Sequence, residues 1–206
     1  MKRHVVVSSI LVTAIFFFSQ LVYGQSGTAV DLVKSTTIEV VDRIKTDRDK
    51  IESDPDYIFL LMDQLVVPHF DFQTMSRAVL GAAWRSASSE QQTAFLNEFK
   101  ELLIGTYATN LTEYSDNQIV FHPDETRPDS CFVLVRTEVK GAVNNNPLPI
   151  DYRMHHVNGK WMVVDVAVDK VSLVSTYRGS FRSEINNDGL DSLIAKLAEK
   201  NNRTPL

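Results

Sequence analysis

The segment IDYRMHHVNGKWMVVDVAVD, residues 150–169, restricts the fold of this chain more than any other. Apolar residues alternate with polar ones before Asn158-Gly159, and this dipeptide between two such segments is the strongest short signal for a β-hairpin. The second strand, Lys160 to Val168, is apolar on both faces, which indicates that both faces are partly covered. We therefore expect an antiparallel sheet built around this hairpin.

Helical spacing of apolar residues dominates the chain before and after the predicted sheet. A capping-box pattern, Ser88 to Gln91 or Ser89 to Gln92, opens the best-defined helix. Strand-like residues also occur in 118–123 and 131–141. Helices are expected at 28–51, 55–67, 72–80, 89–111, 171–185 and 190–197. This order predicts one α+β domain, with a meandering antiparallel sheet of about four strands covered by helices.

Residues 1–24 have the pattern of a secretory signal peptide. A short basic head is followed by an apolar run and then by Gly24, after which we expect cleavage. The apolar run is shorter than the ~20 residues of a membrane span, although an uncleaved anchor is the alternative. We therefore expect an exported, periplasmic protein in which residues 25–206 form a single domain.

The charge balance excludes one class of partner. Residues 1–24 contain two basic residues and no acidic ones, so residues 25–206 carry 19 basic against 26 acidic side chains, a net charge of −7. Nucleic-acid binding needs clustered lysine and arginine, so no nucleic-acid partner is expected. Neither a cofactor nor a metal site is expected, because His155 and His156 are adjacent on a strand and point to opposite faces.

Asp165 is the one residue that we weigh as a catalytic group. A carboxylate in the middle of an apolar strand needs a partner, since burying it alone is costly. It would serve as a general base in an enzyme with a cone-shaped cavity. A structural role, as an ion-pair partner or a backbone cap, is favoured because no second catalytic group lies at a defensible spacing. The chain is therefore not expected to be an enzyme.

The segment 171–185 places four apolar side chains, Leu173, Tyr177, Phe181 and Ile185, on one side of a helix. This stripe is consistent with ordinary core packing and equally with one wall of a binding cavity. Two arginines, Arg178 and Arg182, flank it.

Three segments resemble one known family, the periplasmic substrate-binding components of the Mla phospholipid-transport system, also called the toluene-tolerance auxiliary family. Residues 54–111 contain a proline-opened helix, a V-L-G turn and the sequence W-R-S-A-S-S-E-Q before an F-x-x-x-F helix. Residues 161–181 are similar to the family's W-x-x-x-D-V, V-S-L-V and Y-R-x-x-F, and residues 189–200 match its closing helix. Lys170 stands where the family usually has glycine, so the tight turn there is not assumed.

The resemblance implies a periplasmic carrier that holds phospholipid acyl chains in an apolar cavity between sheet and helices and so helps to maintain outer-membrane lipid asymmetry. It implies exchange of lipid with an inner-membrane ABC transporter complex and with an outer-membrane lipoprotein–porin complex. A carrier of another apolar lipid, such as a hopanoid, is the alternative within this class. Arg85 and Arg178 are the candidates for contact with a headgroup phosphate at the rim, and a surface salt bridge is the favoured alternative for each. The expected lipid-binding side chains are Phe99, Leu103, Tyr107, Val133, Val135, Tyr152, Met154, Trp161, Val163, Leu173, Tyr177 and Phe181.

Overall fold

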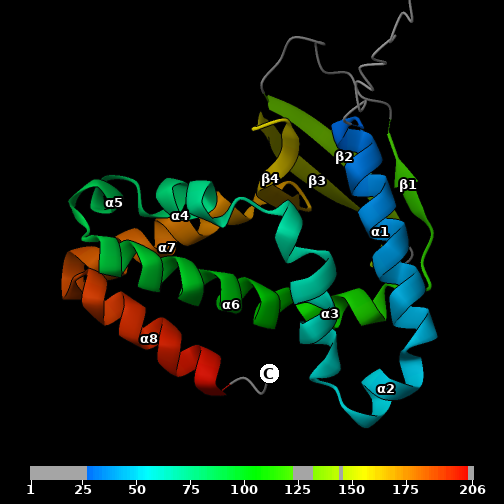
Figure 1. Cartoon of the computed structure of the whole chain (residues 1–206), viewed down its shortest axis with the longest axis horizontal. Helices are drawn as coiled ribbons and strands as arrows, with labels where there is room; N and C mark the ends of the chain where they lie inside the picture. The colour runs from blue at the N-terminus through cyan, green and yellow to red at the C-terminus, as the bar shows by residue number, and fades with distance from the viewer. Residues whose placement is uncertain (1–26, 123–131, 144–145, 204–206) are drawn as a thin grey trace, which may run out of the picture.

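The computed structural model describes residues 27–122, 132–143 and 146–203 (Figure 1). The predicted signal peptide and its cleavage point lie outside these residues. The helices are α1 Ala29–Thr46, α2 Arg48–Ser53, α3 Tyr57–Leu65, α4 Phe72–Leu80, α5 Ala82–Ser86, α6 Ser89–Glu113, α7 Leu173–Asp188 and α8 Leu190–Arg203, with a 3-10 turn at Val67–His69. The strands are β1 Ile119–Phe121, β2 Phe132–Val143, β3 Asn146–Val157, β4 Lys160–Val168 and β5 Val171–Ser172. Within the described ranges, none of the helices has the length and apolarity to cross a membrane.

The sheet confirms the predicted antiparallel meander. Its strands lie in the order β1-β2-β3-β4-β5, and the fifth strand, beyond the four expected, has only two residues. The turn between β3 and β4 is formed by Asn158 and Gly159, which have φ angles of 50° and 78°. Both residues are therefore left-handed, as a two-residue hairpin turn requires.

Helix ends follow local signals in the sequence. Ser88 accepts a hydrogen bond from the backbone N–H of Gln91, whose side chain accepts one from the N–H of Ser88, so the predicted capping box opens α6. The helix expected from residue 55 begins two residues later, at Tyr57. Asp54 accepts a hydrogen bond from the N–H of Asp56 in the turn that precedes this helix.

Three groups of buried apolar side chains hold the layers together. The helical cluster is made by α4 to α8, the sheet cluster joins α1 to the sheet, and the α1–α3 cluster joins α1, α3 and the second half of α6 (Figure 1). The helical cluster consists of Met75, Val79, Leu80, Trp84, Phe95, Phe99, Leu102, Leu103, Val174, Phe181, Leu193 and Leu197. The sheet cluster consists of Ala29, Val33, Val133, Val135, Met154, Val163 and Val166. The α1–α3 cluster consists of Val40, Ile44, Ile58, Leu61, Met62, Ile104 and Ala108.

The starts of α4 and α7 are attached to the sheet next to β4 and β5. Before α4, the N–H of Asp71 donates to the carbonyl of Val163 at 2.9 Å, and Phe70 forms a parallel bridge with the same residue of β4. After β5, the chain enters α7 directly at Leu173. Phe70 and Leu173 are the two partly buried residues that pack against both the helical and the sheet cluster.

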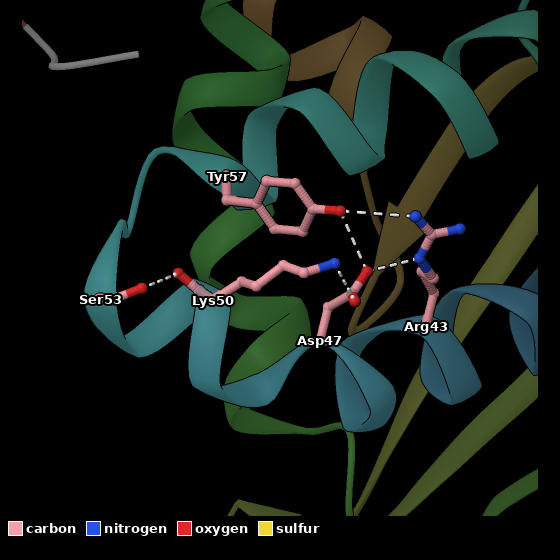
Figure 2. Close-up of polar contacts among 5 residues, drawn as sticks. All are labelled: Arg43, Asp47, Lys50, Ser53 and Tyr57. Atoms are coloured by element: carbon pink, nitrogen blue, oxygen red, sulfur yellow. Dashed lines mark hydrogen bonds and ion pairs between the residues drawn. The ribbon is translucent and has the colours of Figure 1, made fainter.

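A buried carboxylate fixes the corner where α1, α2 and α3 meet. Asp47 is 6% exposed and accepts hydrogen bonds from Lys50 at 2.7 Å, from the Tyr57 hydroxyl at 3.0 Å and from Arg43 (Figure 2). The hydrogen bonds from Lys50 and Arg43 hold its pKa well below the usual range. This network compensates the desolvation of the carboxylate and fixes the direction in which the chain leaves α1.

Candidate functional site

The twelve predicted lipid-binding residues divide between two apolar clusters. Those on α6 and α7 belong to the helical cluster: Phe99, Leu103 and Phe181 are buried in it, and Tyr107, Leu173 and Tyr177 pack against it. Those on the strands belong to the sheet cluster, where Val133, Val135, Met154 and Val163 are buried and Tyr152 and Trp161 are partly buried. Phe99 and Met154 have no exposed surface, so the side chains of each cluster fill their own space.

Aromatic contacts define the helical part of the candidate site. The rings of Phe99 and Tyr177 meet edge-on, with centroids 5.4 Å apart, and Phe181 lies 5.3 Å from Tyr177. Phe95, which precedes Phe99 by one helical turn, also meets Phe181 edge-on at 5.9 Å. These edge-on contacts are the arrangement that aromatic rings favour, and they join the α7 stripe to α6.

Each cluster contains a tyrosine whose hydroxyl is held in its neutral form. Burial raises the pKa of Tyr107 to about 12, and the neighbouring Tyr177 contributes through its charge and a hydrogen bond. Burial also raises the pKa of Tyr152 to about 12, against a smaller lowering effect from Thr137. The site is therefore apolar with a few neutral polar groups, which is the character of a pocket for an uncharged part of a ligand.

One part of the site was missed at the level of sequence. Ala29 and Val33 of α1 are 1% and 5% exposed and cover the inner face of β2 and β3, where the sequence led us to expect α6 and α7. Figure 1 shows α1 lying across this part of the sheet. The helical period of 28–51 signalled an apolar face, but a period does not say which surface that face will meet.

The carboxylate of Asp165 has a structural role. It accepts a hydrogen bond from the Ser172 hydroxyl at 2.5 Å and another from the N–H of Val174 at 3.1 Å. Ser172 in turn caps α7 by accepting from the N–H of Ser175. Asp165 therefore joins β4 to the start of α7, and both of its oxygen atoms are used for that purpose. The opposing strand residue, Arg153, lies against the ring of Phe132 instead.

The two predicted headgroup residues, Arg85 and Arg178, line one hollow of about 970 Å³ between α4, α5 and α7. Arg77 and Arg182 line it as well, and its apolar lining includes Trp84 and Ile185. We call this the arginine hollow. None of the twelve predicted lipid-binding residues lines it.

The paired histidines His155 and His156 were considered as metal ligands on the basis of the sequence. No group of three or more His, Cys, Asp or Glu side chains there is placed to hold a metal ion. His155 lies with its Nε2 3.0 Å from Oδ2 of Asp71, whereas the ring of His156 lies 4.9 Å from the ring of Trp161. The two histidines therefore have separate surroundings, as expected for adjacent strand residues.

Comparison with known proteins gives a consistent result. Residues 34–199 match the protein family described as MlaC protein. The intermembrane phospholipid transport system binding protein MlaC of Haemophilus influenzae is 26% identical over 170 residues, which cover 82% of this chain and 79% of that protein. The toluene tolerance protein ttg2D of Pseudomonas putida is 26% identical over 165 residues, covering 80% of this chain and 76% of that protein.

A solved structure extends the similarity to the fold. It is that of a phospholipid-binding protein from Ralstonia solanacearum in complex with a phospholipid, and it is 31% identical to this chain. The superposition has a TM-score of 0.79 and covers 86% of this chain and 99% of the other. The α+β arrangement of the sheet and helices is therefore shared with a protein of known ligand.

Proposed function

The chain belongs to the MlaC family, and we propose that it is a lipid carrier that holds a phospholipid by its acyl chains and moves it between membranes. The observation that supports this most directly is the similarity to the Ralstonia solanacearum protein, which is 31% identical and was solved with a phospholipid bound. The name of the Haemophilus influenzae relative, a binding protein of intermembrane phospholipid transport, agrees with it.

We place the acyl chains where the helical cluster and the sheet cluster adjoin. Both clusters consist of apolar side chains, and Phe70 and Leu173 pack against both of them. Because the side chains of the clusters are closely packed, entry of a ligand requires the helical layer and the sheet to separate at this junction. The α1–α3 cluster joins the second half of α6 to α1, so we infer a local separation next to Phe70 and Leu173 and not a movement of the whole helical layer.

The energetics of a carrier fit this arrangement. Transfer of the roughly 30 methylenes of two acyl chains out of water is favourable by about 25 kcal/mol. A bilayer supplies the same gain, so the protein has only to match it with an apolar slot. Loading and unloading then depend on partner proteins. We propose the two partners implied by the family, an inner-membrane ABC transporter complex and an outer-membrane lipoprotein–porin complex, and with them a periplasmic location.

The alternatives are less well supported. The two relatives are named for phospholipid transport and toluene tolerance, and the bound ligand of the solved structure is a phospholipid, which does not favour a hopanoid. The enzyme alternative used Asp165 as a base, but both oxygens of that carboxylate accept hydrogen bonds at the start of α7. The headgroup contact of Arg85 and Arg178 stays a prediction.

Native mass spectrometry of the purified protein, followed by lipid extraction, tests the proposal. We expect phospholipid to co-purify at close to one molecule per chain. Protein that remains empty after incubation with phospholipid vesicles would contradict the carrier function.

Substitutions then test the position of the acyl chains. Tyr177 is partly buried against the helical cluster, so Tyr177→Glu places a charge on the helical side of the proposed site, and we expect lipid to be lost while the fold is kept. Ser180→Glu introduces the same charge at an exposed position of α7 and serves as the control. Val163→Glu is less suitable, because Val163 is 3% exposed and its substitution risks unfolding. If Tyr177→Glu unfolds, Leu173→Trp fills the junction without a charge, and full retention of lipid by this variant would contradict the placement.

A further inference from the structure

The arginine hollow concentrates positive charge on an acidic protein. Arg77 of α4, Arg85 of α5, and Arg178 and Arg182 of α7 are all exposed and line the same hollow. No acidic side chain is among its lining residues. The whole chain carries 26 acidic and 21 basic side chains, so this grouping runs against the average charge of the protein.

Two acidic residues of α7 pair with α8 and do not face the arginine hollow. Glu184 and Asp188 of α7 contact Lys196 of α8 at 3.8 and 2.7 Å, on the side of α7 that faces away from α4 and α5. Within the described ranges, no ion pair joins any of the four arginines to a carboxylate. Arg178 donates from Nε to the carbonyl of Ala78 at 2.6 Å, which fixes it across the α4–α7 contact and leaves its charge uncompensated.

The lining of the hollow also has an apolar component. Trp84 is 6% exposed, and the carbonyl of this residue accepts a hydrogen bond from Gln92 at 2.9 Å, which ties α5 to α6. Arginine and tryptophan together are the residues most enriched where protein interfaces derive their binding energy. Guanidinium groups bind carboxylates through two parallel hydrogen bonds, which gives such a surface specificity for acidic side chains.

We propose that the arginine hollow is the docking site for an acidic segment of a partner protein, with carboxylates on the arginines and an apolar side chain against Trp84. A single phosphate is much smaller than a hollow of about 970 Å³, which has the size of a pocket for a larger ligand. The hollow is lined by none of the twelve residues assigned to the acyl chains, and α5 lies at the end of the helical layer away from the sheet (Figure 1). The inference rests on the proposed function only in that a carrier must dock onto the proteins that load and unload it.

Nuclear magnetic resonance of the full, ¹⁵N-labelled exported protein tests this docking site. The probe is a synthetic peptide of alternating glutamate and leucine, and the comparison probes are the same peptide with lysine for glutamate, inorganic phosphate, and nanodiscs containing phosphatidylglycerol. We expect only the glutamate peptide to shift the backbone amides of α4, α5 and the second half of α7. Equal or larger shifts with phosphate or nanodiscs, or none with the glutamate peptide, would overturn the proposal.

Charge reversal provides the matched variants. The double variant Arg77→Glu and Arg182→Glu, at two lining arginines that were not predicted to contact the headgroup, should weaken binding of the glutamate peptide by about tenfold or more, because two attractive contacts become repulsive. The double variant Lys34→Glu and Lys160→Glu, the same change of charge at exposed positions of α1 and β4, should leave the affinity within about twofold. Unchanged peptide binding in the double variant would refute the docking site.

Lipid content of the same samples, measured by native mass spectrometry, separates this inference from the proposed function. The double variant should retain phospholipid at the level of the unaltered protein. Loss of lipid together with folded protein would show that the hollow binds the headgroup, as predicted for Arg85 and Arg178, and would overturn the docking site. Absence of lipid from the unaltered protein, with peptide binding intact, would contradict the carrier function alone.

Discussion

At the scale of single residues, Asp165 shows how a candidate catalytic group becomes a structural one. Its carboxylate receives the Ser172 hydroxyl and the N–H of Val174, which satisfies an otherwise free donor in the first turn of α7. Asp165→Ala should lower the free energy of unfolding by roughly 1–2 kcal/mol, the usual cost of losing a helix cap. Asp165→Asn retains an acceptor and should lose less. Urea unfolding measures both, with Asp42→Ala on the exposed face of α1 as the control.

Asp47 predicts a pH dependence. Its pKa is lowered in the folded protein by hydrogen bonds from Lys50 and Arg43, so the carboxylate stabilises the fold when it is ionised. This contribution is fully present above the ordinary aspartate pKa of 3.8, which applies to the unfolded chain, and is lost as the pH falls toward the lower folded-state value. Asp47→Asn should therefore be less stable than the unaltered protein at neutral pH, and the difference should shrink as the pH falls below about 4.

Urea unfolding between pH 7 and pH 3 measures this difference. Asp49→Asn removes an exposed carboxylate of α2, two residues further along the chain, and serves as the control. A stability difference between Asp47→Asn and the unaltered protein that stays constant over the whole range would contradict the assignment.

At the scale of elements, the β4–β5 connection resolves the question raised by Lys170. The turn forms although the glycine typical of the family is missing, because Asp169 and Lys170 adopt left-handed φ angles of 48° and 66°. A residue with a side chain in this conformation costs roughly 1 kcal/mol. Lys170→Gly should remove that cost and, after the greater freedom of glycine in the unfolded chain is subtracted, raise the free energy of unfolding by about 0.5 kcal/mol.

The reciprocal change tests the same reasoning. Gly159→Ala in the β3–β4 turn, where φ is 78°, should lower the free energy of unfolding by about 1 kcal/mol. Thermal unfolding of the two variants measures both effects. A destabilised Lys170→Gly protein would mean that the lysine side chain makes a favourable contact that outweighs its backbone conformation.

Elements also show what could be predicted from sequence. The hairpin at Asn158-Gly159 and the capping box at Ser88 were predicted correctly because each depends on residues next to one another in the chain. The placement of α1 over the sheet was not predicted, since it depends on which distant surface an apolar face meets. The arginine hollow was not predicted, because Arg77 and Arg178 come together only through the packing of α4 on α7.

At the scale of the whole molecule, the helical cluster and the sheet cluster are two separate apolar cores, and few side chains pack against both of them. This division explains why the predicted lipid-binding residues separate into two groups, and it is the reason why we propose that a ligand enters at their junction. The α1–α3 cluster includes Ile104 and Ala108 of α6, so it joins the second half of α6 to α1, and a movement at the junction has to leave this connection in place.

The two tyrosines with raised pKa values make the stability of the protein depend on pH, and one of them packs against each cluster. Tyr107 packs against the helical cluster and Tyr152 against the sheet cluster, and the pKa of each is raised to about 12. The unfolded chain releases these protons near pH 10. The contribution of the two neutral hydroxyls to the free energy of unfolding is therefore fully present below pH 10 and is lost as the pH rises from about 10 toward 12. Urea unfolding across this range should show the decline.

Phenylalanine variants show how much of the loss of stability above pH 10 comes from the tyrosine at each cluster. Tyr107→Phe and Tyr152→Phe remove the titrating hydroxyls, so each variant should show a shallower loss of stability above pH 10 than the unaltered protein. Tyr114→Phe, the same substitution at the end of α6 and outside both clusters, is the control. If bound phospholipid lies between the two clusters, its addition should move the ionisation of Tyr107 and Tyr152 to still higher pH. The ultraviolet absorbance of tyrosinate measures this ionisation. A titration that is identical with and without lipid would place the ligand away from both tyrosines.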